Sequence, residues 1–250
     1  MSDPMATLFI LCNPQNPSGN IWSREELKKI GELAVKYNVT VISDEIHCDL
    51  TDPGYEYIPF ASVSDECRKV SVTCLAPTKT FNIAGIQTAA VCVPDDFLRF
   101  KVWRGLNTDE VAEPNVFACE AAIAAFNEGG EWLDELRAYI AENKRIARDF
   151  IRKELPELHV IESHATYLMW IDVSGWDYMK GIKPVEGDED TAKKAGPLTA
   201  SDVLRRKSGL FLSEGGIYGG NGASFLRMNL ACPKATVLGG LERLKRAVTE

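Results

Sequence analysis

Residues 69–85 read KVSVTCLAPTKTFNIAG, and they contain the strongest indication of the fold. Its first seven residues are rich in β-branched and apolar side chains, which predicts a buried strand. Pro77 follows the strand, and Lys79 stands between two threonines just beyond it. Lysine is usually a solvated surface residue, because its charge is costly to bury. A lysine at the end of a buried strand therefore calls for a chemical explanation.

Three further short runs predict strands of the same sheet. ATLFILC at 6–12 stops at the turn formers NPQNPSG, VTVISD at 39–44 ends in an acidic residue, and TAAVCV occupies 88–93. Between the first two, Ser23 and Glu26 have the spacing of a capping box, which predicts the start of a helix. Apolar strands with a helix between them indicate an α/β fold, with a mixed, mostly parallel sheet and helices on both faces.

The pattern changes after residue 130. Residues 131–155 carry apolar side chains at intervals of three to four, which predicts one long helix that ends before Pro156. Beyond it, short strand-like runs alternate with short helices, as in a small α+β domain. We therefore expect part of a large α/β domain at 1–130 and a small C-terminal α+β domain at 131–250.

The composition excludes several classes of protein. Of the 250 residues, 45% are apolar and 26% charged, which is typical of a globular protein. A formal net charge of −8 argues against nucleic acid or an anionic membrane as partner. No apolar run approaches the roughly 20 residues that span a bilayer. The seven cysteines are odd in number and include no CxxC pair, which indicates reduced, buried thiols in a cytoplasmic protein.

Three polar residues each follow a predicted strand, namely Asn16, Asp44 and Lys79. Ligands of open α/β sheets bind at the carboxyl ends of the strands, so we expect these residues to converge there. A buried lysine loses its charge, and a neutral amine attacks carbonyl carbons. A buried aspartate needs a partner such as a protonated pyridine, and an amide can donate to a phenolate oxygen. The set suits pyridoxal phosphate, with its aldehyde on Lys79, its ring nitrogen on Asp44 and its ring oxygen on Asn16.

Four segments resemble the signature segments of fold-type I pyridoxal-phosphate enzymes, the class I/II aminotransferase superfamily. They are NPQNPSG, SDEIHCDL, APTKTFNIAG and FLRMN, and they occur in the family's order. The second and third are most similar to the forms found in cystathionine β-lyase-like C–S lyases. The resemblance covers essentially the whole chain. It implies the fold of the pyridoxal-phosphate-dependent transferases, a small amino-acid substrate and a homodimeric complete enzyme.

The resemblance also implies a role for each matching residue near the cofactor. Lys79 would hold the cofactor as a Schiff base and then move the substrate Cα proton. Asp44 would keep the pyridine nitrogen protonated. Asn16 and His47 would contact the ring oxygen, and Thr78 is a candidate phosphate contact.

Further positions concern the substrate and the phosphate. Arg227, in FLRMN, would clamp the substrate carboxylate, and Tyr218, in a glycine-rich loop, is a candidate lining residue. Aminotransferases usually carry a serine three residues before the lysine and an arginine eight after it, both on the phosphate. Here these positions hold Ala76 and Gln87. The C–S lyase subgroup tolerates this pattern, so the departures favour a lyase and imply that other elements bind the phosphate.

Family members have a long segment before the NPxNP motif, whereas this chain starts one strand before it. We therefore expect an N-terminally truncated chain, which lacks the front part of the large domain and binds cofactor poorly alone. The predicted function is a C–S β-lyase that cleaves cystathionine or related cysteine thioethers to thiol, pyruvate and ammonia. An aminotransferase and a non-catalytic truncated fragment stay open as alternatives.

Each candidate also has a purely structural interpretation. Lys79 fits a solvated loop lysine, Asp44 a helix cap and Asn16 a turn former. Arg227 fits a surface arginine on an edge strand. For these four the functional interpretation is preferred, whereas His47 is evenly balanced between a cofactor contact and a packed histidine.

Several other residues are expected to have no role in the site. His159 and His164 lack metal-ligand spacing and are interpreted as surface or turn residues, and we expect no metal site. Tyr167 and Trp170 are expected in the core. The polar, aperiodic residues 176–197 predict a mobile loop.

Overall fold

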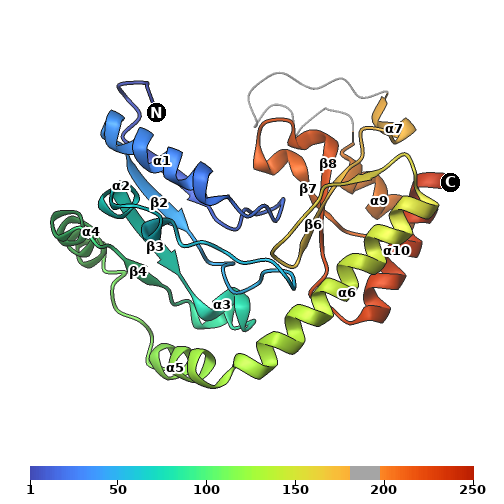
Figure 1. The fold of residues 1–250 in the computed structure, drawn as a ribbon. Helices are drawn as coiled ribbons and strands as arrows, with labels where there is room; N and C mark the ends of the chain where they lie inside the picture. Colours follow the sequence, from blue (N-terminus) through green and yellow to red (C-terminus); the bar gives the residue numbers. More distant parts are fainter. Residues whose placement is uncertain (181–197) are drawn as a thin grey trace. The chain divides into compact units, whose positions relative to one another are not determined.

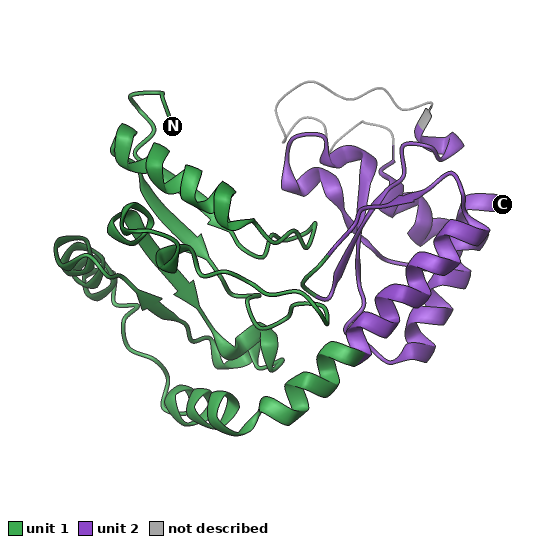
Figure 2. Cartoon of the chain, in the orientation of Figure 1, with its two compact units in different colours: residues 1–138, 164–166 green, residues 139–163, 167–250 purple. Residues whose placement is uncertain are grey.

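The computed structural model describes residues 1–180 and 198–250, and the chain divides into two compact units (Figure 2). Unit 1 comprises residues 1–138 and 164–166, and unit 2 comprises residues 139–163 and 167–250. The short segment 164–166 belongs to unit 1 because Ala165 forms an antiparallel bridge with Thr51 and His164 stacks on Tyr55. None of the described helices is both long enough and apolar enough to cross a lipid bilayer.

Unit 1 is built on a four-stranded sheet with the order β1-β2-β3-β4 (Figure 1). The strands are β1 (Leu8–Cys12), β2 (Thr40–Asp44), β3 (Ser71–Leu75) and β4 (Ala90–Cys92). The first three run parallel, and β4 is antiparallel to β3. The predicted mixed, mostly parallel sheet is confirmed. Because β1, β2 and β3 are parallel neighbours, their carboxyl ends lie at one edge of the sheet.

Helix α1 (Arg24–Tyr37) packs its apolar stripe on one face of this sheet. Ser23 and Glu26 form the predicted capping box, which satisfies two free N–H groups at the helix start. Leu27 of α1 and Leu11 of β1 lie in one buried cluster. Unit 1 also contains α2 (Asp65–Val70), α3 (Pro77–Thr80), α4 (Asp96–Thr108), α5 (Ala118–Glu128) and the 3-10 turns η1 (Phe60–Ser62) and η2 (Ala84–Ile86).

Apolar side chains are exposed on the opposite face of the sheet and on the later helices of unit 1. Leu8 and Ile10, which alternate with buried Leu11, are 50% and 64% exposed. All three residues of β4 are exposed, and α4 has no buried residue. Large exposed side chains from α4 onward include Phe97 and Trp103. Unit 1 therefore exposes several large apolar side chains on this sheet face and on its later helices.

Helix α6 (Gly130–Glu154) is the predicted long helix, and the division between the two units falls within it. Its apolar stripe includes the buried residues Ile140, Ala147 and Ile151. The chain leaves the helix at Leu155, immediately before Pro156, which lacks the N–H that a further helical turn requires.

Unit 2 contains an antiparallel sheet with the order β5-β6-β8-β7 (Figure 1). Its core joins one face of this sheet to α6, α9 and α10, and includes Ile171, Leu204, Leu226 and Leu241. Of the predicted loop 176–197, the first residues form the short helix α7, and 181–197 lie outside the described residues. The elements of unit 2 are β5 (His159–Val160), β6 (Leu168–Asp172), α7 (Asp177–Lys180), α9 (Ala200–Ser208), β7 (Ser213–Glu214), the 3-10 turns η3 (Gly215–Tyr218) and η4 (Gly222–Ser224), β8 (Phe225–Asn229) and α10 (Lys234–Thr249).

Candidate active site

The segments that carry Asn16, Asp44 and Lys79 follow three adjacent parallel strands. Asn16 lies in the turn after β1, Asp44 is the last residue of β2, and Lys79 lies in α3, which begins two residues after β3. In the register of the sheet, Cys12, Asp44 and Cys74 are direct neighbours. The three segments therefore begin at one edge of unit 1.

The turn after β1 is held by hydrogen bonds within its own residues. Gln15 Oε1 accepts bonds from the N–H and the hydroxyl of Ser18, at 2.9 and 2.5 Å. The N–H of Gly19 donates to the carbonyl of Gln15 at 2.7 Å, and Gly19 has a φ of 72°, which favours glycine. Asn16 is half-buried in this turn, and its peptide bond to Pro17 is cis.

Backbone hydrogen bonds tie the end of β2 to both neighbouring strands. The N–H of Asn13 donates to the carbonyl of Asp44 at 3.0 Å, and the N–H of Glu45 donates to the carbonyl of Cys74 at 3.0 Å. The carboxylate of Asp44 accepts a hydrogen bond from the N–H of Ile46 at 3.2 Å. Asp44 is therefore fixed at its main chain and at one carboxylate oxygen.

Glu45 is a buried acid beside Asp44 that the sequence reasoning missed. It is 1% exposed, and it accepts hydrogen bonds from Ser43 Oγ at 2.7 Å, from the N–H of Phe60 at 3.0 Å and from the hydroxyl of Tyr57. Burial raises the pKa of Glu45, and the bonds from Phe60 and Ser43 oppose that rise. Its carboxylate anchors residues 57–60 beneath the carboxyl edge.

Lys79 is exposed, contrary to the expectation that it lies buried. Its neighbours Thr78 and Thr80 are 8% and 0% exposed. Successive residues of a helix point about 100° apart, so the turn that places both threonines against the protein directs Lys79 outward. The amine is therefore accessible to a ligand from solvent.

The other predicted cofactor contacts differ in exposure. His47 is 4% exposed and lies in the turn after β2, close in sequence to Asp44. Thr78, the candidate phosphate contact, is buried in α3. Ala76 is also buried, whereas Gln87 is exposed and has a φ of 51°.

Two thiols flank Asp44 along the row of the sheet. Cys12 lies beside it on β1 and Cys74 beside it on β3. Burial raises the pKa of both thiols, and the negative charge of Asp44 raises it further. The carboxylate of Asp44 thus has two half-buried sulfur atoms as its neighbours.

The cysteines are free, but they are not uniformly buried as expected. Cys67 is buried against α1, whereas Cys92 and Cys119 are exposed. Cys92 belongs to β4, all of whose residues are exposed, and Cys119 to α5, whose one buried residue is Ala118. Among residues 1–180 and 198–250, no three His, Cys, Asp or Glu side chains are grouped so that they could hold a metal ion.

Arg227 and Tyr218, the predicted substrate residues, lie together in unit 2. The guanidinium carbon of Arg227 is 5.1 Å from the centre of the Tyr218 ring. Nη2 of Arg227 donates to Ser213 Oγ, its cross-strand neighbour on β7, at 3.3 Å. The arginine is thus supported on one face and at one nitrogen.

Trp170 belongs to this group and not to the core, contrary to the sequence prediction. It pairs with Arg227 across β6 and β8, so both side chains lie on the sheet face opposite the core. Its ring makes an edge contact with Tyr218, at 5.5 Å between centres, and stacks on Phe225 at 5.0 Å. The aromatic group forms a rigid support for Tyr218.

The glycine-rich loop holds Tyr218 through a close approach of its own backbone. A Cβ atom at Gly222 would lie 2.1 Å from the carbonyl oxygen of Gly215, and one at Gly215 would lie 2.7 Å from the Trp170 ring. Only glycine fits both positions, which explains why the segment that carries Tyr218 is so rich in this residue.

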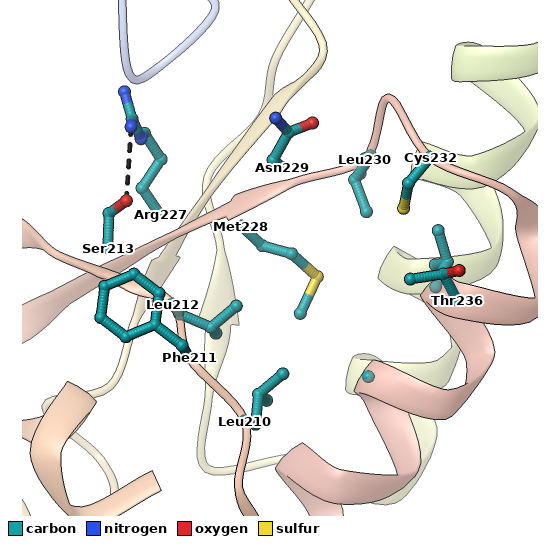
Figure 3. A pocket seen from close by; sticks show the side chains of 12 residues that line it. Leu210, Phe211, Leu212, Ser213, Arg227, Met228, Asn229, Leu230, Cys232 and Thr236 are labelled. Atoms are coloured by element: carbon teal, nitrogen blue, oxygen red, sulfur yellow. Dashed lines mark hydrogen bonds between the residues drawn. The ribbon is translucent and has the colours of Figure 1, made fainter. Parts of the chain in front are cut away.

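Unit 2 also contains an apolar cavity of about 320 Å³ (Figure 3). Its lining includes Leu210, Leu212, Met228, Leu230, Cys232 and Val237. Figure 3 shows that Met228 points into the cavity while the guanidinium of Arg227 points to the other side of β8. Ser213 and Arg227 also line this cavity, so it extends to the strands that carry the predicted carboxylate-binding arginine.

Comparison with known proteins gives one family over nearly the whole chain. The family model for aminotransferase class I and II matches residues 2–244. Among curated proteins, cystathionine beta-lyase PatB of Bacillus subtilis (strain 168) is 43% identical over 249 residues. That match covers 100% of this chain and 60% of PatB, so the chain spans about three fifths of its relative.

Solved structures agree with this similarity. Cystalysin from Treponema denticola, whose structure contains a pyridoxal 5′-phosphate cofactor, has a TM-score of 0.85 and 31% identity. The match covers 98% of this chain and 58% of cystalysin. The pyridoxal-phosphate-bound C–S lyase from Staphylococcus hominis has a TM-score of 0.83 and 30% identity, covering 98% of this chain and 57% of that one.

Proposed function

Because the chain belongs to the class I and II aminotransferase family, we propose that it carries the catalytic residues of a pyridoxal-phosphate-dependent C–S β-lyase. The observation that supports this most directly is the placement of Lys79 and Asp44 beyond adjacent parallel strands of one sheet edge. Similarity to PatB and to the C–S lyase from Staphylococcus hominis supports the reaction class. The substrate would be cystathionine or a related cysteine thioether.

The residues at the carboxyl edge fit pyridoxal phosphate by their chemistry. Lys79 offers an accessible amine for the aldehyde carbon, and Asp44 offers a fixed carboxylate for the ring nitrogen. Asn16 and His47 offer donors for the ring oxygen, and Thr78 a hydroxyl for the phosphate. When bound, the cofactor would supply an electron sink conjugated to the substrate Cα.

Lys79 would perform the proton transfers of the reaction. With the cofactor bound, Nζ of Lys79 would remove the Cα proton of the substrate. The carboxylate of Asp44 would face the ring nitrogen and favour its protonated form. Loss of the Cα proton lets the β-carbon–sulfur bond break, and the sulfur leaves with the bonding electrons. Protonation of the thiolate would give the thiol, and water would hydrolyse the remaining aminoacrylate to pyruvate and ammonia.

Arg227 would bind the α-carboxylate of the substrate. A guanidinium presents paired N–H donors that match two carboxylate oxygens. Ser213 and Tyr218 support it at a nitrogen and on a ring face, which limits the rotation of its planar group. A guanidinium held in this way loses less conformational entropy when a carboxylate binds.

The first test is whether this chain forms a covalent bond to pyridoxal phosphate at Lys79. The purified chain would be mixed with the cofactor, reduced with borohydride, digested and mapped by mass spectrometry. We expect the reduced adduct on the Lys79 peptide of the wild type. Lys79→Arg keeps the charge and should lose the site-specific label. A label spread evenly over exposed lysines, with no preference for Lys79, would refute the assignment.

An aminotransferase is the second candidate, because the family includes this activity and the two reactions share their first steps. They differ in the fate of the proton, which returns to the cofactor in transamination while the β-substituent stays in place. Ala76 and Gln87 stand where the aminotransferase pattern has two phosphate ligands, which favours the lyase. Pyruvate and thiol formed from cystathionine without an added keto acid would support the lyase, and keto-acid-dependent turnover alone would support the transaminase.

The exposed apolar residues of unit 1 suggest which partner the chain binds. Leu8, Ile10, Phe97 and Trp103 are each at least half exposed, which supports a homodimer of the complete enzyme as our proposal. The same exposure supports the third candidate, a chain that is not catalytic by itself, and turnover of cystathionine by the purified chain would exclude that candidate. We propose a cytoplasmic location, supported by seven cysteines that are all free thiols. We propose no nucleic-acid or membrane partner, in keeping with the net charge of −8.

A further inference from the structure

Lys79 lies on a helix that is too short to hold its own conformation. α3 has four residues, and its N-cap residue, Ala76, makes no side-chain capping bond. A single helical turn gains little from its own hydrogen bonds and depends on contacts with the rest of the protein. The orientation of Lys79 therefore depends on what holds the residues on either side of it.

Thr80, the residue after Lys79, is held by a carboxylate from another segment. Its side-chain hydroxyl donates to Oδ2 of Asp49 at 3.1 Å, across 31 positions of sequence. Thr80 is 0% exposed and Asp49 is half-buried, so this bond is partly shielded from water. A hydrogen bond to a charged acceptor that is shielded from water is stronger than a neutral one.

Asp49 lies at the far end of the turn that follows β2. The turn is closed by the N–H of Cys48 donating to the carbonyl of Glu45, at 2.9 Å, and by the N–H of Leu50 donating to the carbonyl of His47, at 3.0 Å. Asp44 precedes this turn directly. The bond between Asp49 and Thr80 thus joins the segment that carries Asp44 and His47 to the helix that carries Lys79.

The residue that follows α3, Phe81, makes an apolar contact with the rest of unit 1. The N–H of Phe81 donates to the carbonyl of Pro77 at 2.9 Å, and the Phe81 ring packs against Trp132 and Phe126, each at 5.9 Å between centres. Apolar packing is not directional, so it fixes the position of the helix better than its rotation. The hydrogen bond from Thr80 to Asp49 is directional, so it can fix the rotation of α3.

We propose that Asp49 is a positioning residue for Lys79, acting through the hydroxyl of Thr80. With Thr80 bound to Asp49, α3 is kept at the rotation that directs Nζ of Lys79 away from the protein, beside the segment of Asp44. The inference rests on the proposed function, because it assigns Lys79 the bond to the cofactor aldehyde. It adds a residue that touches neither the cofactor nor the substrate.

The test compares variants that remove or keep this one hydrogen bond. Thr80→Val has nearly the same shape but no hydroxyl, Asp49→Ala removes the acceptor, and Thr80→Ser restores the donor. Ser71→Ala is the matched control, because it removes a buried hydroxyl that donates to the Arg68 carbonyl at 3.3 Å, at the other end of β3. All variants are made in the full 250-residue chain.

The main measurement is the amount of label on Lys79 at a series of pyridoxal-phosphate concentrations. The amine and the aldehyde condense with loss of water, borohydride adds hydride to the C=N bond, and mass spectrometry quantifies each lysine. We expect Thr80→Val and Asp49→Ala each to raise the half-saturating concentration for Lys79 about tenfold. Thr80→Ser and Ser71→Ala should stay close to the wild type, and the Thr80→Val/Asp49→Ala double variant should be no worse than either single one.

A thermal melt of each variant separates positioning from general stability. The inference is supported if Thr80→Val loses the Lys79 label at temperatures where it is still folded, while the other lysines are labelled as in the wild type. It is overturned if Thr80→Val is labelled normally, or if Ser71→Ala with an equal drop in Tm loses the label equally. Failure of the wild type to label Lys79 is a different result, since it refutes the proposed function itself.

Discussion

The guanidinium of Arg227 lies over the ring of Tyr218, with 5.1 Å between the guanidinium carbon and the ring centre. The ring is in turn held by an edge contact with Trp170. A cation over the face of a rigid aromatic ring is attracted to its negative potential without losing its N–H donors. The arrangement orients a planar group whose edge is suited to a carboxylate.

This contact predicts that Tyr218 contributes to substrate affinity through its ring and not through its hydroxyl. Tyr218→Ala should weaken binding of an amino-acid substrate to the cofactor-loaded protein by about three- to thirtyfold. Tyr218→Phe, which keeps the ring, should bind as the wild type does. Calorimetric titration with alanine, which has no β-leaving group and is not cleaved, measures both, and equal losses in the two variants would contradict the prediction.

Buried Glu45 predicts a pH dependence of stability. Because burial raises its pKa in the folded chain, the folded state binds this proton more tightly than the unfolded state. Its contribution to stability is therefore fully present below the ordinary carboxyl pKa and is lost as pH rises through the raised value.

The variant Glu45→Gln tests this dependence, because its amide cannot titrate. Urea titrations between about pH 5 and 8 measure the free energy of unfolding of both proteins. As pH falls, the wild type should become more stable relative to Glu45→Gln. A difference that is constant with pH would show that Glu45 does not titrate in this range.

The contact between α1 and α2 predicts a pair of coupled substitutions. A Cβ atom at Gly31 would lie 2.4 Å from Sγ of buried Cys67. Gly31→Ala should therefore destabilise the chain, because overpacking costs about 1–3 kcal/mol and exceeds the gain of about 1 kcal/mol in helix propensity. In a Cys67→Ala background the same change should cost less, since the sulfur is gone. Urea unfolding of the four combinations measures the coupling, and simple additivity would contradict it.

The unequal environments of the cysteines predict an order of alkylation by iodoacetamide at pH 8. Cys92 and Cys119 are exposed and should react first. Burial, followed by the charges of Asp49 and Glu45, raises the pKa of Cys48 to about 12, so only about one part in 10⁴ of it is thiolate at that pH. Mass mapping over time should find Cys48 among the last to react. In denaturant all seven should react at similar rates, and early reaction of Cys48 in the native chain would contradict its environment in the structure.

Part of the fold follows from local sequence. The capping box of Ser23 and Glu26 starts α1 as predicted, and Pro156 lies just beyond α6. Both signals act within a few residues, so a single sequence carries them. Helix α4 was not predicted, although Asp95 caps it by accepting from the N–H of Leu98 at 2.8 Å. Leu98, Val102 and Leu106 are half-buried, whereas Phe97, Phe100 and Trp103 are exposed. Apolar residues therefore occur on both sides of the helix, and their periodicity is hard to recognise in the sequence.

The carboxyl edge could be predicted because turn formers and polar residues interrupt apolar strands there. The exposure of Lys79 could not, since it depends on the rotation of a four-residue helix. The placement of Trp170 could not either, because LMWID is apolar on both faces and its pattern does not distinguish the core side. Two further hydrogen bonds join distant residues, Glu45 to Phe60 across 15 positions and Asp49 to Thr80 across 31. No local sequence pattern indicates such bonds.

The row of Cys12, Asp44 and Cys74 gives this protein an internal spectroscopic probe. The S–H bonds of thiols absorb infrared light in a window where other protein groups are nearly transparent, and their frequency responds to the local electric field. A change in the charge around Asp44 would be felt by both sulfur atoms, one on each side. Because the chain has seven free thiols, the bands of Cys12 and Cys74 would be identified by difference, from the band that is lost when each is replaced by serine. The field at the proposed cofactor-binding carboxylate can thus be followed from two directions without adding any label.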